Sequence, residues 1–511
     1  MQNKKLIYAG ATLLLLVISV ALILMSQALE GSAAIIYADP LRWLREADLG
    51  VLAESLATAT GVMLAILGIA ITVVAIIVEL AANRYNHRIT SLFIREPANV
   101  IVLGFFVITT IVCFWATTTL TDAPVQAVLP RAGFLLTIIL VVLSLLIILP
   151  YFAYVLSFVS PMNMIRRIRA EAEGAMSMAA DNFRTAHVEQ VNEAVDELHD
   201  VVRSAMEQSD RSIAMAGIDA LSDLVSHYQD QRSKLPKEWF RICESIENDP
   251  DFVSLEPFAL AQIEKDATWF EVKVCRQYLL LMVMSSMHMR DISYLIAINT
   301  RRMATDAVSE NRPLLQLCIR CFNSYLRSTI NVGDQRTSYY LFNQYRLLAE
   351  AITDESDASV VEEIARHFQF YGQLAFSLGQ TFLLEVASYD VMRLVENSAR
   401  RGSSNLDPLL VLLLGFDREI RMDTEEDSLL GVRRAQIQAA TMLIEMGDLD
   451  RARLIANDLA GENPDRLERV RAHLATEDRA HYWELTDRGI TFNYLDPKYR
   501  VHLETLFEWL R

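Results

Sequence analysis

The chain has 511 residues, of which 52% are hydrophobic and 22% charged, and its formal net charge is −17. This length exceeds what one hydrophobic core supports, so at least two domains are expected. The acidic balance argues against nucleic acid as a partner, because phosphate recognition requires clustered lysine and arginine. The hydrophobic excess lies in the first 160 residues. We therefore predict a membrane domain over residues 1–160 and an all-helical cytosolic domain over residues 161–511.

Four apolar stretches before residue 160 are long enough to cross a bilayer. They cover residues 6–25, 56–78, 100–118 and 132–158. The first stretch follows Lys4 and Lys5 and exceeds the roughly 7–15 apolar residues of a signal peptide, so we predict an uncleaved anchor. A signal peptide cleaved near Ser32-Ala33-Ala34 is the alternative. The lipid bilayer is therefore the first predicted partner.

Basic residues gather on one side of these spans. The loops after the first and third spans are acidic or nearly uncharged, so the positive-inside rule predicts that both termini are cytoplasmic. Arginines after the second and fourth spans are predicted to anchor the chain at the cytosolic interface. These anchors are Arg84, Arg88, Arg95, Arg166, Arg167 and Arg169.

Small and hydroxyl residues form one stripe along the second span. Their spacing of three or four places them on one helix face. The stripe consists of Ala57, Gly61, Ala65, Gly68, Thr72 and Ala75, and Glu79 continues it. Such stripes usually indicate close packing between membrane helices. In the alternative, the stripe lines a pore or the axis of a homo-oligomer, with Glu79 in a ring at the cytosolic mouth.

Residues 71–115 read ITVVAIIVELAANRYNHRITSLFIREPANVIVLGFFVITTIVCFW. Together with the flanking residues, about 55–160, this text resembles a bacterial family of predicted membrane proteins of unknown function (domain of unknown function 2254). The matching positions are Ala81, Tyr85, Arg88, Leu92, Arg95, Val102, Leu103, Gly104 and Cys113. The resemblance implies a multi-pass protein of the bacterial inner membrane and nothing about mechanism.

Beyond residue 161 the sequence reads as one amphipathic helix after another. Residues 162–184, 188–206 and 213–228 form the first three predicted helices. The run 268–287 is apolar nearly all round and is predicted to be the most buried helix. Lys273, Arg276 and Arg290 leave too few uncharged residues there for a fifth span.

One stretch near the end of the sequence resembles a tetratricopeptide unit. Gly447 lies at a turn between two helical patterns, Ala452 is midway along the second, and Pro464 follows it. Helix pairs recur about every 35–45 residues before this point, which predicts a divergent α-solenoid. An irregular helical bundle is the alternative. A capped helix after Asp496-Pro497 is predicted to close the domain.

Catalytic signatures are absent from the sequence. It contains no glycine-rich phosphate loop, no G-x-S-x-G and no H-E-x-x-H. Cys318 and Cys321 form a CxxC on an apolar helix face, which favours core packing over metal or redox chemistry. His481 lies at helical spacing from Glu477 and Glu484, which favours a solvated helix face. We expect no cofactor, no metal and no enzymatic reaction.

Two functions agree with these patterns. The first is a membrane-tethered protein whose cytosolic helical repeats bind a protein or peptide partner. The alternative is an oligomeric ion channel or transporter that uses the stripe of the second span.

Overall fold

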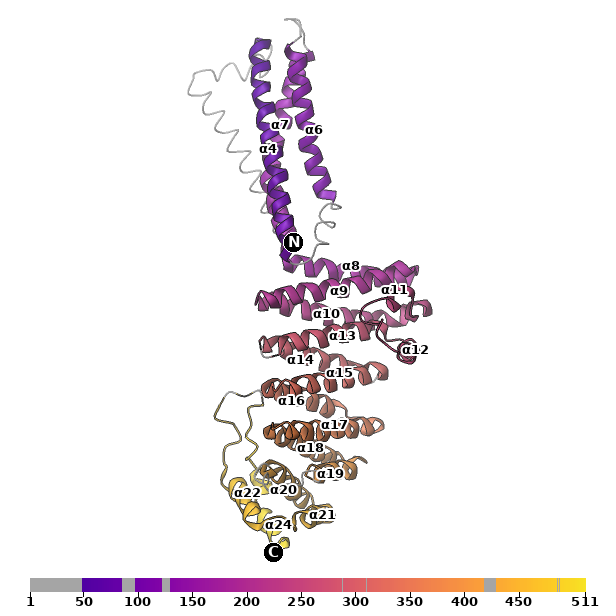
Figure 1. Ribbon diagram of the computed structural model, residues 1–511, viewed down its shortest axis with the longest axis vertical. Coiled ribbons are helices and arrows are strands. Elements are labelled where there is room, and N and C mark those ends of the chain that lie inside the picture. The colour runs from indigo at the N-terminus through magenta and orange to yellow at the C-terminus, as the bar shows by residue number, and fades with distance from the viewer. Residues whose placement is uncertain are drawn as a thin grey trace. The chain divides into compact units, whose positions relative to one another are not determined.

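The computed structural model describes residues 48–84, 97–121, 129–417 and 429–511, apart from residues 287, 309, 485 and 487. The chain divides into two units, Met1–Arg167 and Ile168–Arg511. Both are built from helices (Figure 1), and within the described residues the only strand-like pairing is an isolated bridge between His481 and Ile490. The all-α prediction is therefore confirmed for the described part of the chain.

Unit 1 contains three long apolar helices. They are α4 (Leu49–Arg84), α6 (Pro97–Thr121) and α7 (Leu129–Val159). The stretches Gly50–Leu80, Pro97–Thr118 and Gly133–Ser157 are long and apolar enough to cross a membrane. They coincide with the second, third and fourth predicted spans, whereas the first, residues 6–25, lies outside the described residues. Helix α7 continues through Pro150.

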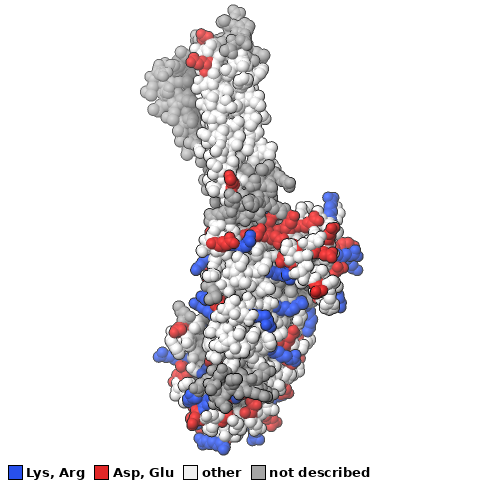
Figure 2. Space-filling model, in the orientation of Figure 1, with Lys and Arg blue, Asp and Glu red and all other residues white. Residues whose placement is uncertain are grey.

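The three helices of unit 1 are apolar on the outside as well as at their contacts. Met63, Phe106 and Val141 are buried where the helices meet. The rings of Phe106 and Tyr151 meet edge to face at 6.5 Å. Large apolar side chains elsewhere are exposed, and this unit is almost free of charge on the face drawn in Figure 2. An apolar exterior is the requirement for helices surrounded by lipid.

Unit 2 is made of shorter helices. Helix α8 (Pro161–Asp181) continues across the boundary between the units at Arg167. The helices that follow are α9 (Thr185–Glu207), α10 (Arg211–Gln231), α11 (Glu244–Glu247), α12 (Pro257–Asp266), α13 (Trp269–Ser285), α14 (Arg290–Ala307), α15 (Arg312–Asn331), α16 (Gln335–Ala351), α17 (Ala358–Ser377), α18 (Thr381–Arg401), α19 (Leu406–Leu414), α20 (Leu430–Glu445), α21 (Leu449–Leu459), α22 (Pro464–Thr476), α23 (Pro497–Arg500) and α24 (Leu503–Trp509).

The helices of unit 2 stack in two layers. Helices α9, α13, α15, α17 and α19 contact one another in that order, and α10, α14, α16, α18 and α20 form the second layer (Figure 1). Successive helices such as α15 and α16 or α17 and α18 pair across the layers. The turns inside these pairs are short because glycine adopts a left-handed conformation there, with φ of 76° at both Gly333 and Gly379. Asp334 then caps the next helix through the amide of Thr337.

Helix α13 is buried on every side in its first two turns, but one face near its end is exposed. Trp269, Phe270 and Tyr278 are fully buried, but Leu280 and Val283 are exposed. The prediction that this is the most buried helix is wrong, because α20 has thirteen buried residues of sixteen, against twelve of seventeen in α13.

Residues 477–496 form an irregular segment between α22 and α23. Here the prediction of a helix carrying His481 is wrong, since α22 ends at Thr476 and His481 pairs with Ile490 in an extended bridge. Gly489, with φ of 63°, turns the chain between them. The closing helix predicted after Asp496 is capped there, and it is divided into α23 and α24.

Candidate functional site

The stripe of small residues on α4 faces away from α6 and α7. All seven residues from Ala57 to Glu79 that define it are exposed. Nothing lies within 4 Å of where a Cβ would stand on Gly61 or Gly68. Helix α4 instead meets its neighbours through larger residues such as Leu56 and Met63. The stripe is therefore an open surface of the described part of unit 1.

The predicted anchors differ in their surroundings. Arg88 and Arg95 lie outside the described residues, and Arg84 is the last residue of α4. Arg166 is exposed and donates to the Oδ1 atom of Asn163 over 2.7 Å. Arg167, which follows it in α8, is half-buried. Arg169 pairs with Glu173 at 2.6 Å and also with Asp223 of α10, so its charge is directed at carboxylates of unit 2.

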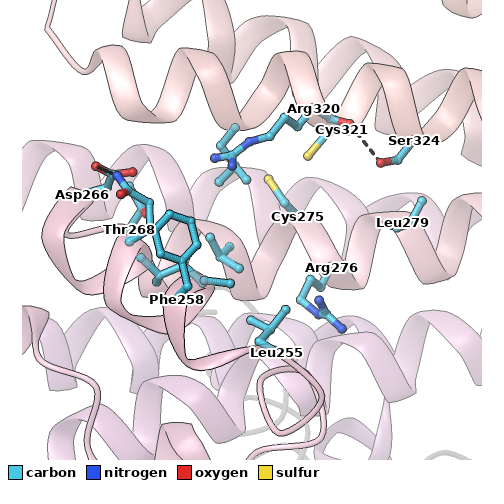
Figure 3. Close-up of a pocket in the computed structure, with 15 residues that line it drawn as sticks. Leu255, Phe258, Asp266, Thr268, Cys275, Arg276, Leu279, Arg320, Cys321 and Ser324 are labelled. Carbon is cyan, nitrogen blue, oxygen red and sulfur yellow. Dashed lines mark hydrogen bonds between the residues drawn. The ribbon is translucent and has the colours of Figure 1, made fainter.

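A cavity of about 360 Å³ opens between α12, α13 and α15 (Figure 3), and we call it the thiol cavity. Its lining is mainly apolar, from residues such as Leu255, Ile263, Val272 and Leu317. Figure 3 shows the sulfur atoms of Cys275 and Cys321 pointing toward each other. A volume of this size lies at the lower end of the range for sites that bind small ligands.

Three free thiols meet beside this cavity. Cys275 comes from α13 and the CxxC pair, Cys318 and Cys321, from α15, and all three are buried. Hydrogen bonding with Cys318, together with burial, raises the pKa of the Cys275 thiol well above its usual value. Hydrogen bonding with Cys275 and burial raise the pKa of Cys321 in the same way. Protonated thiols are poor nucleophiles and poor metal ligands, and within the described chain no group of three such residues has metal-binding geometry.

Two arginines border the thiol cavity. Arg276 of α13 lies 3.6 Å from the Oδ1 atom of Asp251. Arg320 of α15 is exposed and lines the cavity, and in the described part of the chain no carboxylate pairs with it. Asp266 also lines the cavity, where its carboxylate accepts a hydrogen bond from Gln262 at 2.8 Å.

The wall formed by α12 is loosely held. None of its ten residues is buried, although α12 presents Phe258, Ala259 and Ile263 to the cavity. The side chain of Phe258 is 81% exposed. A short helix without buried residues separates from its neighbours at little cost in apolar burial.

A second cavity, of about 480 Å³, has aromatic walls, and we call it the aromatic cavity. Tyr339 of α16 and Phe382 of α18 supply one side, and Tyr482 and Phe492 of the irregular segment supply the other. The rings of Phe382 and Phe492 stack at 6.4 Å. Beside them Trp483 is 73% exposed and stacks on Tyr482 at 4.3 Å.

A buried ion pair holds the irregular segment in place. The Arg488 guanidinium donates to both carboxylate oxygens of Asp390 on α18, and both side chains are almost fully buried. The same guanidinium lies over the ring of Tyr339, 4.7 Å from its centroid. Gln438 of α20 donates to the carbonyl oxygen of Phe492 over 2.9 Å. The segment is thus attached to α16, α18 and α20.

A cluster of three carboxylates surrounds Lys273. Its ammonium nitrogen lies 2.6 Å from Asp196, 2.8 Å from Asp249 and 2.7 Å from Asp251. The Lys273 side chain is 1% exposed. Burial, opposed by Lys273, raises the pKa of Asp196 to about 6. The cluster joins α9 and α13 to the loop that contains Asp249-Pro250-Asp251.

Sequence reasoning identified the CxxC pair but missed its third thiol. The buried positions of Cys318 and Cys321 agree with core packing. Cys275 lies more than forty residues earlier, and only the side-by-side contact of α13 and α15 brings it to the pair. The predicted helical repeat does indicate this contact. In a two-layer repeat every second helix lies in the same layer, so α13 and α15 are expected to be neighbours. No local pattern marked the aromatic cavity.

These features define a helical membrane protein. The family model described as a predicted membrane protein (DUF2254) matches residues 6–229. The family resemblance is therefore confirmed, and the match continues past the apolar helices as far as α10. No curated protein matches the chain. A solved circular tandem repeat protein with novel repeat topology and enhanced subunit contact surfaces aligns with 82% of this chain and 96% of its own, at 12% identity and a TM-score of 0.35.

Proposed function

We propose that this is a non-enzymatic multi-pass protein of the bacterial inner membrane whose cytoplasmic helical unit binds a peptide or protein partner. Unit 2 is, in this proposal, a divergent α-solenoid with a tetratricopeptide-like end. The two stacked layers support the first part, and the turn at Gly447 between α20 and α21 supports the second. Repeat stacks of this type offer extended surfaces for recognition.

The aromatic cavity is the observation on which partner binding rests. Tyrosine and tryptophan dominate the binding energy of protein interfaces, because they bury a large area with few rotatable bonds. Trp483 is exposed next to a cavity walled by Tyr339 and Phe382. Arg336 and Glu484 also line it and offer one charge of each sign. We infer that an apolar side chain of the partner enters this cavity while its backbone meets the polar residues.

The test compares variants of the full-length protein in lipid nanodiscs. Trp483→Ala and Phe382→Ala should each reduce crosslinking of a specific cytoplasmic partner at least tenfold, the loss expected for a central interface aromatic. Phe370→Ala removes an exposed aromatic residue of α17 outside both cavities and should leave crosslinking unchanged. Equal capture by all three variants, or the absence of any specific partner, would contradict the proposal.

A second candidate function is an oligomeric channel or transporter, favoured by the exposure of the whole α4 stripe. Bare glycines such as Gly61 and Gly68 allow another helix backbone to approach closely. Around an oligomer axis, Glu79 of each copy would form an acidic ring. Reconstituted protein should then conduct, and Glu79→Gln should lower cation selectivity. A monomer in nanodiscs, or an oligomer that does not conduct, would exclude this function.

A further inference from the structure

We propose that the thiol cavity binds an amphipathic anion, a carboxylate or phosphate with an unbranched apolar tail. This site is separate from the aromatic cavity and does not depend on the partner proposed for it. Three features of the cavity indicate such a ligand: its apolar lining, the arginines beside it and the loosely held wall α12.

The inside of the cavity suits an apolar chain. Apolar side chains such as Leu255 and Leu317 line it, and the protonated thiols of Cys275 and Cys321 add soft, polarisable atoms. An apolar tail that fills this space removes its own surface and that of the lining from water, which favours binding. The exposed ring of Phe258 would be covered in the same event.

The charge beside the cavity selects an anion. Among the described residues, Arg320 and Arg276 line it beside a single carboxylate, that of Asp266, which accepts a hydrogen bond from Gln262, whereas the protein as a whole has a net charge of −17. Arg276 already faces Asp251 at 3.6 Å. Arg320 has no carboxylate partner among the residues that the structure describes, and we assign it the head group. Guanidinium binds carboxylate and phosphate through paired hydrogen bonds, which gives this residue the required chemistry.

Entry of the tail needs only a small movement of α12. None of its residues is fully buried, so the outward shift of this helix breaks few apolar contacts. Helices α13 and α15 on the opposite side contact each other and contain many buried residues. The ligand would therefore find one adaptable wall and one fixed wall.

The experiment measures protection of the cavity thiols in the full-length protein in phosphatidylcholine nanodiscs. Because Cys275 and Cys321 are buried and protonated, their slow modification by N-ethylmaleimide is followed over hours at alkaline pH by peptide mass spectrometry, with Cys243, outside the cavity, as internal reference. Saturating dodecanoate should slow modification of the two cavity thiols at least fivefold and leave Cys243 unchanged. Dodecyltrimethylammonium, which has the same tail and a positive head, should not protect them.

Two variants test the parts of the site separately. Arg320→Gln should raise the dodecanoate concentration that gives half-maximal protection about tenfold, as expected for the loss of a hydrogen bond to a charged group. The matched control is Arg302→Gln on α14, which removes an exposed arginine outside the cavity and should change nothing. Ala259→Trp fills the cavity with both arginines intact, and it should slow modification of the cavity thiols without ligand and make it insensitive to dodecanoate.

The outcomes decide both the site and the source of its ligand. Equal protection by the anion and the cation, or protection unchanged in Arg320→Gln, would overturn the proposal, as would no protection at any concentration. Protection in phosphatidylglycerol nanodiscs without dodecanoate would identify an anionic bilayer lipid as the occupant. Protection by dodecanoate alone would identify a free fatty acid.

Discussion

Single buried charges hold distant parts of unit 2 together. Lys273 is surrounded by three carboxylates from α9 and the loop before α12, and Arg488 joins the irregular segment to Asp390 of α18. A buried charge that loses its partner keeps its desolvation penalty, so each such residue is more important for stability than an exposed pair.

The first expectation concerns Lys273. Lys273→Met preserves the length of the side chain but leaves three carboxylates without their counterion, so we expect it to lower the free energy of unfolding by about 3–5 kcal/mol. Thermal unfolding of the full-length protein, followed by circular dichroism, provides the measurement. Lys498→Met, at an exposed lysine 3.9 Å from Asp496, is the control and should cost less than about 1 kcal/mol. Similar losses in both variants would contradict this view of the cluster.

The same cluster should make stability depend on pH. The pKa of Asp196 rises from 3.8 to about 6 on folding, so the folded protein binds this proton more tightly than the unfolded chain does. The resulting stabilisation is fully present below pH 3.8 and is lost as the pH rises through about 6. We expect Asp196→Asn to be less pH-dependent than the wild type between pH 4.5 and pH 7. If the melting temperatures of the two proteins change with pH in the same way, Asp196 is not the source of the pH dependence.

The sequence predicts where the helices lie better than it predicts which helices contact one another. Helix bounds such as those of α9 and α10, and three of the four expected spans, follow from local periodicity and from apolar length. Lateral neighbours do not, because α13 and α15 meet only through the two-layer stacking. Spacing likewise places the residues of the α4 stripe on one helix face but does not say what covers that face.

The irregular segment was missed for a different reason. Glu477, His481 and Glu484 have helical spacing, but Gly489 and the bridge from His481 to Ile490 favour an extended turn. The decisive contact is the ion pair of Arg488 with Asp390, and no local pattern connects residues so far apart in the chain. Tertiary contacts therefore outweigh a weak helical preference here.

Amide hydrogen exchange measures how strongly Arg488 stabilises the irregular segment. Arg488→Gln removes the charge that pairs with Asp390, so we expect amide hydrogen exchange in residues 477–496 to rise at least tenfold while α9 and α10 stay protected. Arg479→Gln, at an exposed arginine of the same segment, is the control. Unchanged exchange in Arg488→Gln would show that the aromatic contacts are sufficient to hold the segment.

At the scale of the whole molecule, the two units differ in what surrounds them. Unit 1 exposes apolar side chains, whereas Figure 2 shows both signs of charge over the surface of unit 2. This contrast agrees with a chain that has one unit in lipid and one in water. The proposed orientation assigns the water-exposed unit to the cytoplasm.

Orientation is testable with single-cysteine reporters in whole cells. We expect Asp122→Cys to react with a membrane-impermeant maleimide added outside, and Arg88→Cys to react only after the membrane is permeabilised. The positive-inside distribution of arginines is the reason for this expectation. The reverse labelling pattern would invert the topology and would exclude a cytoplasmic partner for unit 2.

The two walls of the aromatic cavity lie far apart in the sequence, so they are synthesised at different times. Tyr339 and Phe382 come from the middle of unit 2, whereas Tyr482 and Phe492 are synthesised a hundred or more residues later. While the chain is still being translated, α16 and α18 can fold, but the opposite wall does not yet exist. A partner that needs both walls would therefore bind only after Tyr482 and Phe492 have been synthesised and folded onto α16 and α18.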